Sequence, residues 1–403
     1  MDQPIKNNRK IGLYFHVPFC EQKCHYCNFA IDIRNRDYLY SRYIEALMIE
    51  LQRQSWISNC EITGIDIGGG TPTRLPKNEL IKLLMVLRPL KRLCSHPFPL
   101  SIETTPRIAA LEPEKLLALK EFGVDRISVG IQSSNGKILR KVNRDGKQTL
   151  ISDTAFQNIC NFKFKRWNVD LIFGLPGQSI KAWKCDLNFV LSYRPDSITT
   201  YDCLYRGKSR IIAKCSNLPK PKEYGQMYDL GYDYLRSNGY YAPYGSVNFS
   251  RNRFESGVSA YFESRLLDGL PFLGLGNYAS SLINQYWFFN IYSVNRYLEL
   301  LQDREPLIDD CYYLPSEEWA TKYVLWSLNF GTIDEKRFKG CTGLDFQKQY
   351  EEEIDFAVKK GLIIYKDGLF NISTGEFCQI NRLRSLFYTH RARRWFLQNA
   401  GVI

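Results

Sequence analysis

The stretch LYFHVPFCEQKCHYCNF, residues 13 to 29, joins an apolar run to three cysteines spaced four and then three positions apart: Cys20, Cys24 and Cys27. No fourth cysteine lies nearby. The residues before the cysteines predict a β-strand, so the cysteines follow directly on a strand end. With only 12 cysteines in 403 residues, this close group indicates a metal-binding loop rather than a disulfide framework.

Six predicted strands alternate with predicted helices between residues 11 and 204. The strands are IGLYFHV (11–17), TGIDIGG (63–69), PLSIETT (99–105), VDRISVGIQ (124–132), RWNVDLIFG (166–174) and DSITTYD (196–202). Helices are predicted between them, among others over 38–54, 76–92 and 112–122. Six such units in about two hundred residues predict an α/β fold with a partial TIM-like (β/α)6 barrel rather than a flat doubly wound sheet.

The chain beyond this barrel, which spans residues 1–204, divides into two further segments. From 205 to 310 aromatic residues become frequent, as in EYGQMYDLGYDYLRSNGYYAPYGSVNFS (223–250), and we expect a segment packed on the barrel. Its tyrosine-rich run suits either an aromatic ligand pocket or an aromatic core. Residues 311–403 predict a C-terminal α+β region that ends in a winged-helix-like module, with a hairpin turn at Asp367 and Gly368.

The chain is basic, with 54 Lys and Arg against 42 Asp and Glu and a formal net charge of +12. This balance suits an acidic substrate, nucleic acid or membrane surface, and it also fits an ordinary solvated surface. The polar start MDQPIKNNRK runs into the first strand without a signal region, and no run of eighteen apolar residues follows. We expect a cytoplasmic protein without a membrane span, and no nucleic-acid partner.

Zinc and an iron–sulfur cluster are the two candidates for the cysteine loop. Structural zinc takes four ligands, and His16 or His25 could supply the fourth. A closed zinc site, however, gives no role to the glycine-rich and acidic strand ends further on. A 4Fe–4S cluster held by three thiolates leaves one iron open for a substrate or cofactor. The position of the motif after the first strand of a βα array favours the cluster.

Polar groups follow several predicted strands, at the end where parallel barrels place their active sites. Gly69, Gly70 and Thr71 in DIGGGTPTRL (66–75) predict either a tight turn or a loop whose amides approach a ligand. Glu103 closes the third strand, as a site carboxylate or as a capping or surface acid. Three more polar residues lie at later strand ends or in the following loops: Gln132, Arg144 and Asp170.

The C-x3-C-x2-C motif in this setting resembles the radical S-adenosylmethionine (radical SAM) superfamily. The resemblance implies that the three cysteines bind a 4Fe–4S cluster whose open iron chelates the amino and carboxylate groups of SAM. It also implies that an electron from the cluster cleaves SAM to methionine and a 5'-deoxyadenosyl radical, which abstracts hydrogen from an organic substrate. An electron donor such as flavodoxin or ferredoxin would supply that electron.

The motifs YFHVPFCEQKCHYCNF, GGGTPT, ETTP, DRISVGIQS and DLIFGLPGQ closely resemble one branch of this superfamily. That branch contains oxygen-independent coproporphyrinogen III dehydrogenases, which are HemN-like, and the HemW-type heme chaperones. The resemblance covers the barrel and extends more loosely through LGLGNYASS to the C-terminal end. It implies that Tyr14 lies near the cluster as a catalytic-site residue. It further implies a set of SAM contacts: Gly69, Gly70, Thr71, Glu103, Gln132, Arg144 and Asp170.

Three features depart from this branch. Gly146 stands where relatives commonly carry a histidine, two residues after Arg144. The HNxxYW motif of the HemW-type proteins is missing, because the corresponding stretch VSAYF (258–262) holds neither the histidine nor the tryptophan. Phe29 follows the position where some relatives carry a further cysteine, and in this it resembles the chaperones more than the dehydrogenases.

These departures leave three hypotheses open. The main one is a radical SAM enzyme acting on a small-molecule substrate other than coproporphyrinogen, which could still be a tetrapyrrole. Its nearest counterparts are the class C radical SAM methyltransferases, which resemble this branch and use two SAM molecules. The second is a heme chaperone, although the missing HNxxYW removes an expected heme contact. The third is the dehydrogenase itself, for which a basic surface would suit an acidic porphyrinogen. Heme ligation would fall to one of four histidines: His16, His25, His96 and His390.

Overall fold

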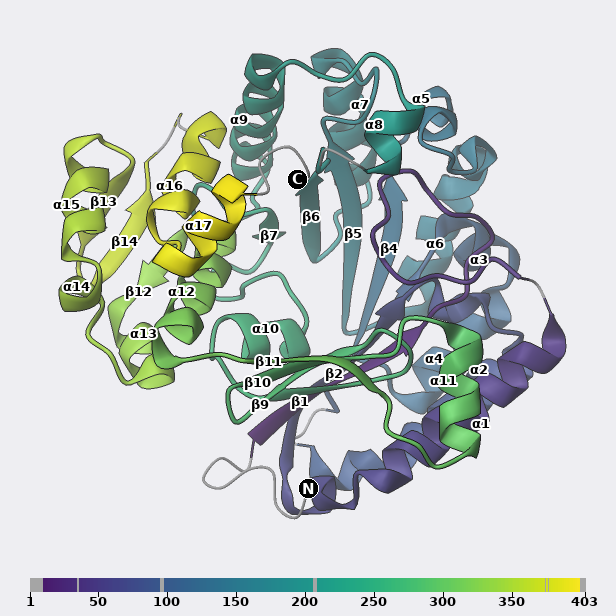
Figure 1. Cartoon of the computed structure of the whole chain (residues 1–403). Helices are drawn as coiled ribbons and strands as arrows, with labels where there is room; N and C mark the ends of the chain where they lie inside the picture. Colours follow the sequence, from purple (N-terminus) through teal and green to yellow (C-terminus); the bar gives the residue numbers. More distant parts are fainter. Residues whose placement is uncertain are drawn as a thin grey trace.

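Six parallel strands form the centre of an eleven-stranded sheet (Figure 1). They are β1 (Lys10–Val17), β2 (Glu61–Gly69), β3 (Leu100–Thr104), β4 (Arg126–Gln132), β5 (Arg166–Phe173) and β6 (Ser197–Asp202). The computed structural model describes residues 10–34, 36–94, 98–205, 209–373, 375 and 377–398, so His96 lies outside the described residues. The predicted partial (β/α)6 barrel is confirmed, and its strands begin and end close to the predicted positions.

Helices cover the outer face of the central strands (Figure 1). They are α1 (Asp37–Arg53), α2 (Lys77–Leu87), α3 (Pro106–Leu111), α4 (Pro113–Phe122), α5 (Gly136–Lys141), α6 (Ser152–Phe162) and α7 (Ile180–Leu191). The helix predicted over 76–92 ends as an α-helix at Leu87 and continues as a 3-10 helix over Arg88–Leu93. Pro89 lies in the first turn of that 3-10 helix, where its missing N–H interrupts the α-helical hydrogen bonds.

The central strands alternate apolar and polar side chains, and this alternation creates two different faces. On β1, Leu13 and Phe15 are fully buried under the helices, whereas Tyr14 and His16 point to the opposite, inner face. Strand β5 repeats the pattern, with Asn168 on the inner face. The outer face therefore forms the hydrophobic core, and the inner face lines the barrel with polar groups.

The segment 205–310 extends the sheet at both edges instead of packing on the barrel as a separate layer. β7 (Asn248–Ser250) pairs antiparallel with β6, and β8 (Phe272–Leu275) pairs parallel with β1. β9 (Ser280–Ile283), β10 (Tyr286–Asn290) and β11 (Ile308–Tyr313) continue the sheet beyond β8. The predicted boundary between residues 310 and 311 therefore falls inside β11. Short antiparallel strands of this kind give no βα pattern in the sequence.

The tyrosine-rich run forms an aromatic core rather than a ligand pocket. It lies largely in α9 (Pro221–Ser237) and the turn after it, and Tyr228 is 2% exposed. The ring of Tyr228 stacks on Phe377 with a centroid separation of 3.6 Å. Because Phe377 belongs to the C-terminal region, this contact holds that region against the barrel.

The C-terminal region combines helices with a three-stranded sheet of order β12-β14-β13. Its elements are α12 (Ser316–Ser327), β12 (Thr332–Asp334), α13 (Glu335–Thr342), α14 (Phe346–Gln349), α15 (Glu351–Lys359), β13 (Ile363–Lys366), β14 (Leu369–Ile372), α16 (Ile380–Leu386) and α17 (His390–Gln398). Asp367 and Gly368 form the predicted hairpin turn, both with positive φ, as a two-residue turn of this type requires. None of the helices that the structure describes is long and apolar enough to span a bilayer.

Two further helices pack against the inner face of the barrel and beside the sheet extension, which is the part of the sheet formed by β8 to β11. α10 (Ala260–Leu266) lies against the inner face of β1 and β2, and α11 (Val294–Gln302) packs against α1. A side chain at Gly64 would collide with the backbone of Ala260 and Tyr261 at the start of α10. The close approach of α10 to the sheet therefore depends on glycine at this position.

We predict that Gly64→Ala lowers the free energy of unfolding by about 2 kcal/mol or more, because the added methyl group must displace helix backbone rather than a flexible side chain. Gly340→Ala is the matched control: its Cβ would have open space in α13, so its stability should stay unchanged or rise slightly. Urea denaturation followed by circular dichroism measures both. Equal stability of the two variants would contradict the close packing of α10.

Candidate functional site

The cysteine loop follows β1 and is closed at its base by main-chain hydrogen bonds. The amide of Cys20 donates to the carbonyl of Asp32 at 3.0 Å, and the amide of Asp32 donates to the carbonyl of Pro18 at 2.8 Å. The loop thus leaves and rejoins the barrel at one place. All three cysteines lie between these two ends, at the carboxyl end of the parallel strands.

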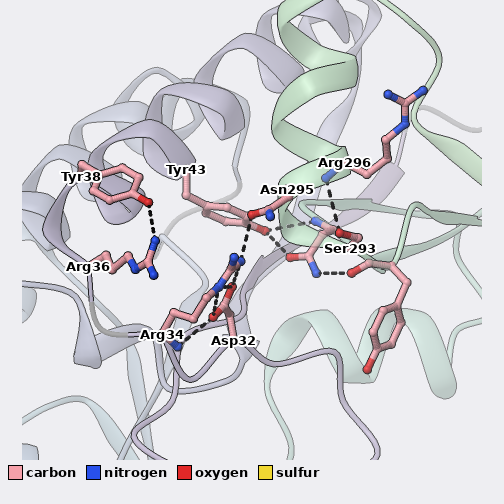
Figure 2. Close-up of polar contacts among 10 residues, drawn as sticks. Asp32, Arg34, Arg36, Tyr38, Tyr43, Ser293, Asn295 and Arg296 are labelled. Atoms are coloured by element: carbon pink, nitrogen blue, oxygen red, sulfur yellow. Dashed lines mark hydrogen bonds and ion pairs between the residues drawn. The ribbon is translucent and has the colours of Figure 1, made fainter.

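Side chains anchor the base of the loop to the sheet extension, as Figure 2 shows. The buried carboxylate of Asp32 accepts hydrogen bonds from the guanidinium of Arg34 and from its amide. Arg34 also donates through Nη2 to Oδ1 of Asn295 in α11, at 2.9 Å. Nearby, the hydroxyl of Tyr43 in α1 contacts the carbonyl of His16 at 2.9 Å. Segments that are far apart in sequence therefore fix the loop.

The three thiols gather between the loop and the rest of the barrel mouth. Sγ of Cys20 lies 3.7 Å from Oγ1 of Thr71, and Sγ of Cys24 lies 4.0 Å from Nη1 of Arg144. Burial raises the pKa of Cys20 to about 12 and also raises the pKa of Cys27. Thiolates are therefore favoured here only when a bound cationic centre supplies compensating charge, as iron does in a cluster.

No three His, Cys, Asp or Glu side chains in the described parts of the chain lie close enough to bind a single metal ion. A mononuclear zinc site would bring its sulfur ligands together on one ion, with Zn–S bonds of about 2.3 Å. In a 4Fe–4S cluster, by contrast, each of the three thiolates binds a different iron. Three cysteine side chains at this spacing are a donor set that such a cluster can use.

The glycine-rich loop after β2 packs directly on the cysteine loop. The amides of Gly70 and Thr71 donate to the carbonyls of Val17 and Phe19, each at 2.8 Å. These two amides are therefore not free for a ligand, contrary to one expectation from the sequence. Gly69 has φ +109°, and a side chain there would collide with the ring of His16. Close packing requires the glycines, and the hydroxyl of Thr71 remains beside Cys20.

Acidic side chains on the inner face surround the interior below this mouth. Glu103 lies on β3, and its side chain is solvent-accessible on the inner face of the barrel. Burial, together with repulsion from Asp170 and Asp66, raises its pKa to about 8. Asp170 accepts hydrogen bonds from Ser128 at 3.0 Å and from Asn168 at 2.8 Å. Glu103 and Asp170 are thus predicted site residues that lie close enough on the inner face to repel one another.

Two charged residues of this interior were not predicted from the sequence. Asp66 on β2 accepts from the hydroxyl of Ser259 at 2.7 Å, and its other oxygen has no hydrogen-bond partner among the described residues. Burial raises its pKa to about 6. Arg126 on β4 donates to Ser101 at 3.3 Å and to the carbonyl of Gly257 at 3.4 Å. Both could have been found from the sequence, because each is a charged residue at an inward position of a strand that is otherwise apolar.

Tyr14 and His16 form a buried pair on β1. Nε2 of His16 lies 2.8 Å from the carbonyl of Ala30, so Nε2 carries the proton and Nδ1 accepts from the hydroxyl of Tyr14 at 3.2 Å. Burial lowers the pKa of His16 to about 4. Both ring nitrogens are thus engaged, which leaves His16 without a lone pair for zinc or heme.

Gln132 and Arg144 complete the predicted set on the β4 side. Gln132 has φ +67° after a bulge in β4, and its Oε1 is buried without a hydrogen-bond partner among the described residues. Arg144 donates to the carbonyl of Gly130 and, at 3.3 Å, to the hydroxyl of Tyr26 in the cysteine loop. The two residues therefore meet at the mouth, next to Cys24.

The stretch 258–262, which corresponds to the missing HNxxYW, lies against the inner face of the barrel, with Ser259 and Tyr261 buried. Ser259 caps α10, and its hydroxyl also donates to Asp66. Tyr261 is 1% exposed, and its ring stacks on Tyr14 with a centroid separation of 5.9 Å. Both residues are thus used in packing the inner face.

The profile of the Radical SAM superfamily matches residues 14–190. A heme chaperone HemW from Bacillus subtilis is 28% identical over 361 residues, which are 87% of this chain and 92% of that protein. An oxygen-independent coproporphyrinogen III oxidase from Salmonella typhimurium is 25% identical over 382 residues, which are 91% of this chain and 81% of that protein.

The solved structure of coproporphyrinogen III oxidase (HemN) from Escherichia coli, described as a radical SAM enzyme, superposes with a TM-score of 0.80. The superposition covers 96% of this chain and 91% of that chain, at 22% sequence identity. At this identity the likeness establishes a shared fold.

We predict that His16 makes the protein less stable in acid. Its pKa is about 4 in the folded chain and 6.5 as an ordinary histidine, so between pH 6.5 and pH 4 the unfolded chain binds the proton and the folded chain does not. The free energy of unfolding should fall by roughly 3 kcal/mol between about pH 6.5 and pH 4 through this group. The buried acids with raised pKa act in the opposite direction, so the readout is the difference between the wild type and His16→Gln in urea denaturation. Identical pH profiles would contradict the assignment.

We also predict that Arg34→Ala loosens the cysteine loop, because it leaves the buried Asp32 carboxylate without its cation and breaks the link to α11. Hydrogen exchange of the Cys20 and Asp32 amides should accelerate roughly tenfold. Arg36→Ala is the control, since Arg36 is exposed and its guanidinium donates to the hydroxyl of Tyr38, away from Asp32 and α11 (Figure 2). Unchanged exchange in Arg34→Ala would show that the main-chain bonds alone hold the loop.

Proposed function

We infer that this chain, a HemN/HemW-like radical SAM protein, binds a 4Fe–4S cluster through Cys20, Cys24 and Cys27 and cleaves SAM to start hydrogen abstraction from an organic substrate. The observation that carries this function is the joining of two loops at the barrel mouth, with Cys20 beside Thr71 and Cys24 beside Arg144. When bound, the cluster supplies the electron that cleaves SAM to methionine and a 5'-deoxyadenosyl radical.

The polar groups at the mouth suit the charges of SAM. Arg144 offers a guanidinium for the carboxylate, and Glu103 and Asp170 offer carboxylates for the amino group and the ribose hydroxyls. A bound cation would favour the ionised form of Glu103, whose pKa burial and nearby acids raise to about 8. The buried Oε1 of Gln132 has no donor among the described residues, and a ligand could supply one.

Tyr14 serves in this proposal as a wall of the site rather than as a proton donor. Its hydroxyl is committed to Nδ1 of His16, and burial raises its pKa well above the ordinary value for tyrosine. The ring of Tyr261 stacks on the ring of Tyr14 and holds it in place. Together the two rings keep this side of the interior dry, which protects a reactive radical from water.

The substrate that we propose is a tetrapyrrole-type small molecule, on the names of the relatives. The interior carries Asp66, Glu103 and Asp170 against Arg126, so it disfavours additional carboxylates. A porphyrinogen would therefore present an uncharged part to the site and keep its acidic side chains toward the basic outer surface, the chain being +12 overall.

A heme chaperone is the second candidate, favoured by the similarity to the Bacillus subtilis HemW along most of both chains. Its heme ligand would not be His16, whose nitrogens are both engaged, nor any residue of the histidine-free stretch 258–262. Of the described histidines, this leaves His25 and His390 as the candidates for heme ligation.

We predict that Cys24→Ala, reconstituted with iron and sulfide under anaerobic conditions, loses the visible absorption of the cluster and loses SAM cleavage by dithionite. Cys160→Ala is the control, because Cys160 is an exposed thiol in α6 that should leave both properties unchanged. Wild-type levels of 5'-deoxyadenosine from Cys24→Ala would refute the ligand assignment.

The same assay, read by mass spectrometry, separates the candidate reactions in the wild type. S-adenosylhomocysteine together with 5'-deoxyadenosine indicates methyl transfer with a second SAM. Deoxyadenosine that rises with coproporphyrinogen indicates the dehydrogenase, whereas tight heme binding with little turnover indicates the chaperone. No deoxyadenosine under any condition would reject radical SAM chemistry for this chain.

A further inference from the structure

Cations gather around the outer side of the cysteine loop. Lys23 belongs to the loop, Lys141 ends α5, and Arg210 and Lys214 begin and end α8 (Arg210–Lys214). Lys141, Arg210 and Lys214 are exposed. None of the four takes part in the ion pairs found among the described residues. We call these four residues the cationic rim.

Contacts between α5, α8 and the loop hold the rim together. The amide of His25 donates to the carbonyl of Val142 at 2.9 Å, and Nδ2 of Asn143 donates to the carbonyl of Lys23 at 2.9 Å. Sγ of Cys215, directly after α8, donates to the carbonyl of Lys141 at 3.3 Å. Figure 1 shows the purple cysteine loop beside α8 and close to α5. The rim is thus one surface built from three segments.

This surface is also where the cysteine loop meets solvent. Phe29 is 56% exposed, and Cys27 is partly exposed, whereas Cys24 is buried. The carbonyl of Phe29 accepts from Nζ of Lys23 at 2.8 Å, so an exposed aromatic ring lies next to the rim. Because electron transfer weakens steeply with distance, this exposed side of the loop is where a reducing protein can come near the cysteines.

We propose that the cationic rim and Phe29 dock an acidic one-electron carrier of the flavodoxin or ferredoxin class. This docking surface rests on the proposed function, since it serves to reduce the cluster. Within the loop, the carboxylate of Glu21 is already paired with Arg107 at 3.1 Å, and that of Asp32 is paired with Arg34. Opposite charges speed the encounter, and one apolar ring among them suits the small interface of a transient redox pair.

The test compares two electron sources in one reconstituted protein. The double variant Lys141→Glu/Lys214→Glu should lose roughly tenfold in the rate of deoxyadenosine formation with reduced flavodoxin at low ionic strength. With dithionite, which needs no docking, its rate and its cluster content should match the wild type. The milder Lys141→Gln/Lys214→Gln variant should fall between them, and added salt should slow only the flavodoxin-driven wild type.

The matched control is Lys336→Glu/Lys366→Glu, which changes the net charge equally on exposed residues of the C-terminal region. An equal flavodoxin defect in this control, or none in the rim variant, would overturn the proposal. A parallel loss with dithionite in the rim variant would overturn it too, because the residues would then act on the cluster. Failure of the proposed function is a separate result: the wild type would form no deoxyadenosine with dithionite.

Discussion

The side-by-side parallel pairing of β1 and β2 is the constraint on which the site depends. In this register Val17 lies opposite Gly69, so the chain leaves both strands at the same level. The pairing continues past the strand ends through the amides of Gly70 and Thr71. The cysteine loop and the glycine-rich loop therefore form one unit, and a shift of either strand would separate Cys20 from Thr71.

Side chains of the central strands alternate between the outer and the inner face of the barrel, and the two faces have different roles. Outward side chains such as Leu13 and Val169 are fully buried under helices and supply the hydrophobic core. Inward side chains do not pack against the helices, so these positions can hold polar groups such as Glu103 and Asp170. Burial raises the pKa of both carboxyl groups. The desolvation cost of Asp170 on this face is partly offset by its hydrogen bonds and by the opposite charge of Arg126.

The sheet extension links distant parts of the chain to the cysteine loop. β8 pairs with the edge of β1 that β2 does not occupy. Further along the chain, Asn295 in α11 accepts a hydrogen bond from Arg34. The opposite flank of the loop is held by Val142 and Asn143, after α5. The loop is therefore fixed from two sides, while its outer surface, which includes the exposed ring of Phe29, stays open to solvent.

Period-two patterns and short motifs are local properties, so they predict the six central strands, the cysteine loop and the order of polar groups along the chain. They do not predict the strands of segment 205–310, since antiparallel edge strands have no βα pattern, and they do not place Asp66 in the interior. The hydrogen bonds that occupy the amides of Gly70 and Thr71, and the contact of Arg34 with α11, follow from the folded structure alone. Such contacts join residues up to 261 positions apart, and their partners are set by packing rather than by neighbouring sequence.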